Sequence, residues 1–149
     1  MKPEYIIIHC SDSTWGSAKE IDKWHKQRGW VGIGYHFVIL NGMVRPHSDR
    51  ILSLAGSVEL GRGMDVIGAH CLGYNERSLG ICLIGDGNES FCVEQFDKLK
   101  GLCQELCKLF EIPAENVLGH GETDSGKAEG KTCPNFDVSA IRMYLKGRV

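Results

Sequence analysis

Short apolar runs, separated by polar segments, predict a buried β-sheet in this chain. Residues 5–9 are dominated by isoleucine, which is typical of a strand that is buried on both faces. Three later runs of similar length give the same prediction. The predicted strands cover residues 5–9, 34–40, 79–84 and 116–119. His9 stands at the end of the first of them, where a side chain can be presented to a site.

A turn signal follows the second predicted strand. Asn41-Gly42 favours a tight hairpin, so we expect residues 43–45 to return as a strand paired with residues 34–40. From residue 46 to residue 75 the periodicity fades and glycines are frequent. Because compact domains rarely keep so much irregular chain without a use, we expect this segment to form walls of a substrate groove.

Strand alternation divides the side chains of residues 35–38 between two faces. Tyr35 and Phe37 are predicted on one face, and His36 and Val38 on the other. Tyr35 and His36 are therefore not expected to point into the same site. We interpret His36, like the isolated His47, as a structural residue, although His36 could orient a metal ligand through a hydrogen bond.

Helical periodicity and end signals predict a helix at residues 17–28. Ser17 and Glu20 have the spacing of a capping box, and Gly29 is placed to end the helix in a left-handed conformation. Apolar residues recur at three- and four-residue steps, which turns one stripe toward the core. His25 lies on this stripe, and we interpret it as a structural edge residue.

Two further helices are predicted, with a polar segment before the last. Residues 93–110 carry a wide apolar stripe, but Cys92 stands where a Ser or Thr cap is usual, so this helix start is poorly capped. Residues 121–131 are polar, and we expect them to be flexible. Asp137 is placed to cap a last helix. The inward positions of that helix are Ile141, Tyr144 and Leu145.

Chain length and element order indicate a single α/β domain over residues 1–149, with a central mixed sheet flanked by helices. The formal net charge of −2 argues against a nucleic-acid-binding protein or one that binds an anionic membrane. No apolar run approaches the ~20 residues of a membrane span. The isoleucine run before His9 is too short for a signal peptide, so we expect synthesis in the cytoplasm.

Seven cysteines are an odd and a large number for a chain of this size. Without a secretion signal we expect them to be mostly reduced thiols. Cys82, Cys103 and Cys107 sit in apolar patterns and are predicted to pack as small hydrophobic residues. No C-x-x-C pair is present, so a local zinc knuckle is not predicted.

The candidate chemistry centres on Lys131-Thr132-Cys133-Pro134. If Cys133 is a metal ligand, its candidate partners are His9 and His120, and Lys131 faces the same cavity. Two histidines and one cysteine, with a fourth position left to water, form one of the ligand sets of catalytic zinc. The spacing alone is a weak signal, because each residue taken singly is more often a hydrogen-bonded histidine or a core cysteine.

Six motifs, taken together and in order, are far more specific. They are Ile6-Ile7-Ile8-His9-Cys10-Ser11, Gly34-Tyr35-His36-Phe37, Gly68-Ala69-His70-Cys71-Leu72-Gly73-Tyr74-Asn75, Ser78-Leu79-Gly80-Ile81-Cys82-Leu83-Ile84-Gly85, Gly119-His120 and Lys131-Thr132-Cys133-Pro134. With them the whole chain resembles the zinc-dependent N-acetylmuramoyl-L-alanine amidases of the phage-lysozyme type, the enzymatic branch of the peptidoglycan recognition protein superfamily. One departure is the segment 121–130, which is longer than in the phage enzyme.

The resemblance implies a set of roles. The implied ligands of one Zn²⁺ per chain are His9, His120 and Cys133. The implied catalytic residues are Tyr35 and Lys131, and the implied substrate-binding residues are His70 and Asn75. Zinc held in this way can lower the pKa of its water to about 7, for attack on the amide between N-acetylmuramic acid and L-alanine. The Lys131 cation would stabilise the oxyanion by about 3 kcal/mol. The Tyr35 hydroxyl either orients the water or passes a proton to the leaving amine.

The resemblance leaves some alternatives open. A peptidoglycan-binding module without catalysis shares this fold, although such members typically lack the cysteine ligand that Cys133 matches here. We expect a monomer whose partner is peptidoglycan, with no nucleic acid and no membrane. Some phage amidases of this size also bind their phage's RNA polymerase, and this sequence does not decide that contact. An endolysin that acts on the bacterial wall is favoured over a cytosolic enzyme that recycles wall fragments.

Overall fold

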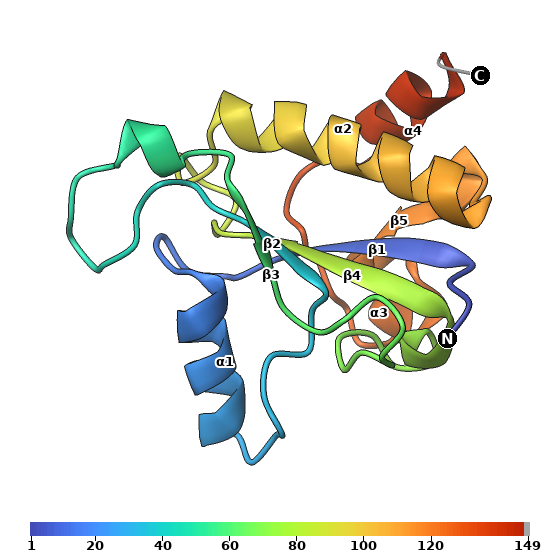
Figure 1. Ribbon diagram of the computed structural model, residues 1–149, viewed down its shortest axis with the longest axis horizontal. Coiled ribbons are helices and arrows are strands. Elements are labelled where there is room, and N and C mark those ends of the chain that lie inside the picture. Colours follow the sequence, from blue (N-terminus) through green and yellow to red (C-terminus); the bar gives the residue numbers. More distant parts are fainter. Residues whose placement is uncertain (148–149) are drawn as a thin grey trace.

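A five-stranded mixed sheet forms the centre of the computed structural model, which describes residues 1–147 (Figure 1). The strands are β1 (Tyr5–Cys10), β2 (Phe37–Ile39), β3 (Val58–Leu60), β4 (Ser78–Leu83) and β5 (Val117–Gly119), in the order β3-β2-β4-β1-β5. β1 is parallel to β4 and β5, β2 is parallel to β4, and β3 is antiparallel to β2. The predicted α/β fold class is therefore confirmed.

Helices cover both faces of the sheet. The α-helices are α1 (Ala18–Gln27), α2 (Val93–Phe110), α3 (Asp124–Ala128) and α4 (Ser139–Lys146). Single 3₁₀ turns occur at η1 (Leu52–Leu54), η2 (Asn75–Arg77), η3 (Ala114–Asn116) and η4 (His120–Glu122). Figure 1 shows α2 and α4 on one side of the sheet and α1 on the other. Within residues 1–147, no helix combines the length and apolarity needed to cross a membrane.

Alternating side chains of the strands divide the core into two layers. Ile8 and Ile81 pack with Leu99 in the layer beneath α2 and α4, and all three are fully buried. Val38 and Cys82 point to the opposite face, where they pack against Ile21 of α1. Because β1 lies between two parallel neighbours, its isoleucines are buried on both faces, as the continuous apolar run predicts.

The ends of α1 lie where the sequence signals predict them, and the start of α2 is held by Gln95. The Ser17 hydroxyl accepts the Glu20 backbone N–H at 3.2 Å, and Gly29 follows α1 with φ +86°. The Cys92 side chain does not replace a Ser cap, yet Gln95 compensates, since its Oε1 accepts the Cys92 N–H at 3.0 Å. The Gln95 amide also donates to the carbonyl of Ile39, which fixes the start of α2 to the sheet.

The predicted hairpin at Asn41-Gly42 is wrong. Residues 43–45 form no strand, and β2 pairs instead with β3, more than ten residues further along. Asn41 is fully buried, and its amide donates to the carbonyls of Thr14 and Ser90, both at 2.9 Å. The asparagine therefore ties three loops together rather than turning the chain back on itself.

Two other predictions need correction. Tyr35 packs with the cluster that contains Val38, whereas Phe37 belongs to the opposite layer, because β2 begins only at Phe37 and strand alternation does not extend back to Tyr35. The segment 121–131 is ordered by η4 and α3 rather than being a flexible loop. Thr123 caps α3 by accepting the Gly126 N–H at 3.0 Å.

Candidate metal centre and active-site cleft

A cleft of about 580 Å³ lies beside the carboxyl ends of β1 and β5. Strands, loops and helices that are far apart in the sequence contribute its lining. All seven residues singled out from the sequence are among the lining residues, namely His9, Tyr35, His70, Asn75, His120, Lys131 and Cys133. The structure thus gathers in one place side chains that the sequence connects only through the set of motifs.

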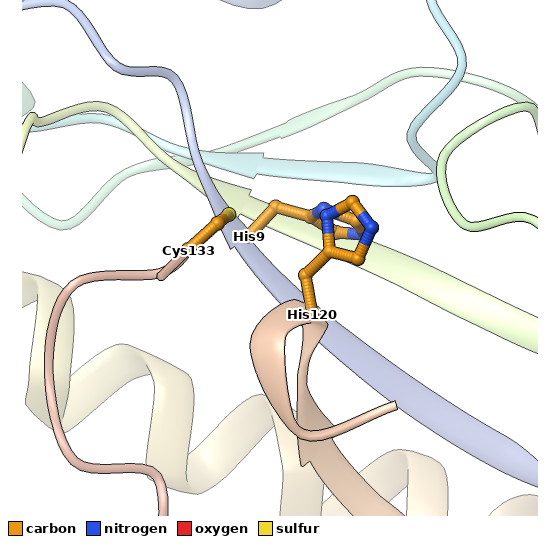
Figure 2. Close-up of side chains that lie close together, drawn as sticks. All are labelled: His9, His120 and Cys133. Carbon is orange, nitrogen blue, oxygen red and sulfur yellow. The ribbon is translucent and has the colours of Figure 1, made fainter. Parts of the chain in front are cut away.

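Three side chains converge in this cleft as a candidate metal centre (Figure 2). His9 comes from the end of β1, His120 follows β5, and Cys133 lies on the loop before α4. One potential ligand atom of each lies within 4.8 Å of those of the other two. This spacing fits a single cation, because ligands about 2.0–2.3 Å from one zinc ion lie roughly 3–4 Å apart.

His9 occupies the most enclosed position of the three. Its side chain is buried at the carboxyl end of β1, with the His120 ring 4.7 Å away between centroids. Burial, followed by the nearby His70 and His120, lowers the pKa of His9 well below its usual value. The imidazole is therefore neutral at physiological pH, which is the form that binds metal ions.

A hydrogen-bonded turn holds His120. η4 starts at this residue, and the His120 carbonyl accepts the Thr123 hydroxyl at 2.7 Å. Glu122 in the same turn forms a two-point ion pair with Arg142 of α4, with both N–O distances at 2.9 Å. Burial, followed by the charge of Lys131, lowers the pKa of His120. The helix on the opposite face of the sheet therefore helps to position a candidate ligand.

The loop that carries Cys133 is fixed by backbone contacts. The Cys133 sulfur accepts the Cys10 N–H at 3.1 Å, and the Cys133 carbonyl accepts the Gly121 N–H at 2.9 Å. A Cβ atom on Gly121 would lie 2.4 Å from the Lys131 carbonyl oxygen, so only glycine allows this approach. The peptide bond between Cys133 and Pro134 is cis.

The donor set fits a zinc-type cation. A hydrogen bond with the Cys10 side chain, and then burial, raises the pKa of the Cys133 thiol. A coordinated cation would replace that proton, and the Cys10 N–H would then face a thiolate and stabilise it. Two neutral imidazoles and one such sulfur leave a fourth tetrahedral position for water or substrate.

The two predicted catalytic residues border the triad. The Tyr35 ring lies 4.9 Å from the His9 ring between centroids. Burial raises the pKa of the Tyr35 phenol well above its usual value, so the hydroxyl keeps its proton at neutral pH. Lys131 is half-exposed, and its ammonium lies 3.9 Å from a carboxylate oxygen of Glu129. Tyr35 thus contributes a neutral donor, and Lys131 a cation, to the lining of the cleft.

His70 and Asn75 also line the cleft, and protein groups bond to their polar atoms. His70 Nδ1 lies 2.9 Å from His9 Nε2. Asn75 Oδ1 accepts the backbone N–H of His70 at 2.7 Å and that of Cys71 at 2.9 Å. Both residues border the cleft, and their direct contact with substrate stays a prediction.

The remaining histidines differ in their placement. His36 is fully buried, accepts the Gly80 N–H at 3.0 Å and donates to the Val66 carbonyl at 2.7 Å, which fits the expected structural role. His47 is exposed. His25 accepts the Gly34 N–H at 3.0 Å, as a structural residue would, but it also lines the cleft.

Sequence reasoning missed the end of α1 as a cleft wall. Arg28 and Trp30 line the cleft beside His25, and the Arg28 guanidinium lies 5.6 Å from the centre of the Trp30 ring. The sequence carries one sign of this wall. His25 and Arg28 are polar, yet they lie on the same helical stripe as the apolar residues before them. The stripe predicts the edge of the core equally well, because helical periodicity does not distinguish a core-facing side from a cleft wall.

Fold and site together define an α/β domain with a candidate metal-binding triad beside the carboxyl ends of parallel strands. A family model described as N-acetylmuramoyl-L-alanine amidase matches residues 1–136. The chain belongs to this family, and its activity is that of an N-acetylmuramoyl-L-alanine amidase.

Individual relatives agree with this assignment. An endolysin of Enterobacteria phage K11 is 33% identical over 142 residues, which cover 89% of this chain and 81% of the phage protein. Among solved structures, the N-acetylmuramoyl-L-alanine amidase LysC from Clostridium intestinale URNW matches with a TM-score of 0.80 and 29% identity, over 98% of this chain and 87% of that chain. Drosophila PGRP-LB matches with a TM-score of 0.62 and 31% identity, over 92% and 85% of the two chains.

Proposed function

We propose that this amidase is zinc-dependent and that His9, His120 and Cys133 hold one Zn²⁺ per chain. The observation that supports this most directly is the approach of their donor atoms to within 4.8 Å of one another, in a cleft that also contains Lys131. The bond it cleaves joins the lactyl group of N-acetylmuramic acid to L-alanine in peptidoglycan.

The residues around the triad divide the work of amide hydrolysis. When bound, zinc supplies a Lewis acid that activates water and polarises a carbonyl. The Lys131 ammonium stabilises the negative charge that develops on the amide oxygen, an effect of about 3 kcal/mol for one such group. The Tyr35 hydroxyl, which keeps its proton, serves as a hydrogen-bond donor at the scissile amide. The walls that contain His70 and Asn75 contact the substrate.

The biological role that we propose is lysis of the bacterial cell wall by a phage or prophage endolysin. The similarity to an endolysin of Enterobacteria phage K11 supports it. In this role the protein is made in the cytoplasm of the infected cell and acts on the wall as a monomer.

Digestion of purified sacculi tests the reaction. The zinc-loaded protein is incubated with sacculi, and the soluble products are analysed by mass spectrometry. We expect intact stem peptides with a free L-alanine amino terminus. Release of glycan fragments alone would refute amide hydrolysis, and retained binding without any product at full zinc occupancy would favour a binding module.

Three variants separate metal binding from catalysis. Cys133→Ala should lose zinc and activity together, because the thiolate is a ligand. Lys131→Ala should keep zinc and lose about 10²–10³ in kcat, the usual effect of removing one oxyanion-stabilising group. Lys127→Ala is the matched control, since Lys127 is an exposed lysine on α3 that does not line the cleft. Unchanged metal content in Cys133→Ala would show that the ligand assignment is wrong.

A further inference from the structure

The His70 ring uses both of its nitrogens inside the protein. Nδ1 faces His9 Nε2 at 2.9 Å, and Nε2 faces the Ser78 hydroxyl at 3.3 Å. The Ser78 hydroxyl in turn donates to the Tyr74 carbonyl at 2.7 Å. A chain of hydrogen bonds therefore runs from a candidate metal ligand, through a second histidine, to a backbone carbonyl.

The Tyr74 carbonyl determines which group donates and which accepts in each of these hydrogen bonds. A carbonyl only accepts, so the single Ser78 proton goes to Tyr74, and the Ser78 oxygen must accept from His70. His70 then carries its proton on Nε2, which leaves a lone pair on Nδ1. That lone pair accepts the proton on His9 Nε2, so the lone pair of His9 lies on Nδ1, free to bind a cation.

Two glycines, which have no side chain, leave the space that the His70 ring occupies. A Cβ on Gly80 would lie 2.8 Å from the His70 Cγ, and a Cβ on Gly68 would lie 2.6 Å from its Cδ2. His36 holds the Gly80 N–H at 3.0 Å, and its ring stands nearly perpendicular to that of His70, with 5.9 Å between centroids. Two glycines and a buried histidine thus confine the ring to this orientation.

We propose that His70 is a positioning residue, which acts through His9 by fixing its tautomer and ring orientation so that Nδ1 is presented to the metal. This inference rests on the proposed zinc site and changes the role of His70, whose ring acts on the ligand while the loop around it borders the substrate. Ser78 acts one step further from the metal site, because its hydroxyl fixes the tautomer of His70 and thereby that of His9.

Two substitutions of similar size at position 70 provide the test. His70→Asn keeps an acceptor oxygen near the place of Nδ1, whereas His70→Leu keeps bulk and accepts no hydrogen bond. Zinc affinity is measured by competition with a chromophoric chelator. The protonated nitrogen of His9 is identified in the metal-free, ¹⁵N-labelled protein from its ring nitrogen shifts and couplings.

We expect wild-type His9 to carry its proton on Nε2. His70→Leu should weaken zinc binding about 10- to 100-fold and let the Nδ1-protonated form of His9 appear. His70→Asn should restore the affinity to within a few-fold of wild type. Ser78→Ala should weaken zinc binding by a smaller factor, and because it lies one step further from the triad it serves if His70→Leu does not fold.

Three results would overturn the proposal. They are a wild-type His9 protonated on Nδ1, wild-type affinity in His70→Leu and Ser78→Ala alike, and equal losses in His70→Asn and His70→Leu, which would assign His70 a packing role. A protein that binds no zinc would instead overturn the proposed function. The tautomer measurement needs no metal, so the two failures remain distinguishable.

Discussion

Gly80→Ala is the sharpest perturbation that the structure suggests, because it moves one ring without touching a ligand. The added methyl carbon would lie 2.8 Å from both Cγ and Cδ2 of His70 and 2.9 Å from its Nδ1. Carbon atoms in contact lie about 3.5–4.0 Å apart, so the ring must retreat by roughly 0.7 Å or more. A shift of that size is enough to stretch the 2.9 Å contact with His9 beyond hydrogen-bonding distance.

The expected losses follow from this displacement. Overpacking a tight site costs about 1–3 kcal/mol, and the lower freedom of alanine in the unfolded chain offsets about 0.4–1 kcal/mol of it. We therefore expect the free energy of unfolding to fall by about 1–2 kcal/mol and zinc affinity to fall about tenfold. Urea unfolding of the metal-free protein measures the first quantity, and chelator competition measures the second.

Gly101→Ala is the matched control. Gly101 lies inside α2, and nothing stands within 4 Å of a Cβ built there. The same substitution should raise the free energy of unfolding by up to about 1 kcal/mol and leave zinc affinity unchanged. If Gly80→Ala kept wild-type stability and affinity, the argument from close packing around His70 would be wrong.

Three further predictions follow from contacts outside the cleft. Arg142→Met removes the two-point pair with Glu122 and should cost about 1 kcal/mol in urea unfolding, with weaker zinc binding in chelator competition; unchanged values for both would show that the pair does not support η4. Hydrogen bonding to Lys26, and then to the Ile33 N–H, lowers the pKa of Asp22, so its contribution to stability is present above the unfolded pKa and is lost as pH falls through the folded pKa. Asp22→Asn should therefore flatten the acid limb of a stability-against-pH curve, and a parallel curve would contradict this. Leu99→Ala should lower the free energy of unfolding by about 2–5 kcal/mol, because Leu99 is fully buried beneath α2, and a smaller loss would mean that the layer collapses into the gap.

Local patterns predicted the elements whose causes are local. The isoleucine run gave β1, and the capping signals at Ser17 and Gly29 gave the limits of α1 within a residue or two. The hairpin at Asn41 failed because a buried asparagine can bond to distant carbonyls as readily as it turns the chain. The structure of residues 121–131 was missed because α3 is only five residues long, too short for an apolar stripe.

The residues of the candidate site could be predicted from the sequence only when all the motifs were considered together. His9 and Cys133 are separated by most of the chain, and no spacing rule joins them. Only the resemblance to a known family predicted them as ligands of one metal ion, and the structure shows that their donor atoms lie close together. The hydrogen bond between His9 and His70 was beyond sequence reasoning, since it depends on the glycines that let one ring approach the sheet.

The strand order of the sheet has a consequence for synthesis on the ribosome. β1 leaves the exit tunnel first, yet its partners are β4 and β5, and β5 is translated only after α2. A nascent chain must therefore hold an isoleucine-rich strand unpaired until β4 has been made, and with one edge unpaired until β5 follows, which exposes it to aggregation or chaperone capture. The proposed zinc site is completed later still, because the thiol of Cys133 emerges after β5.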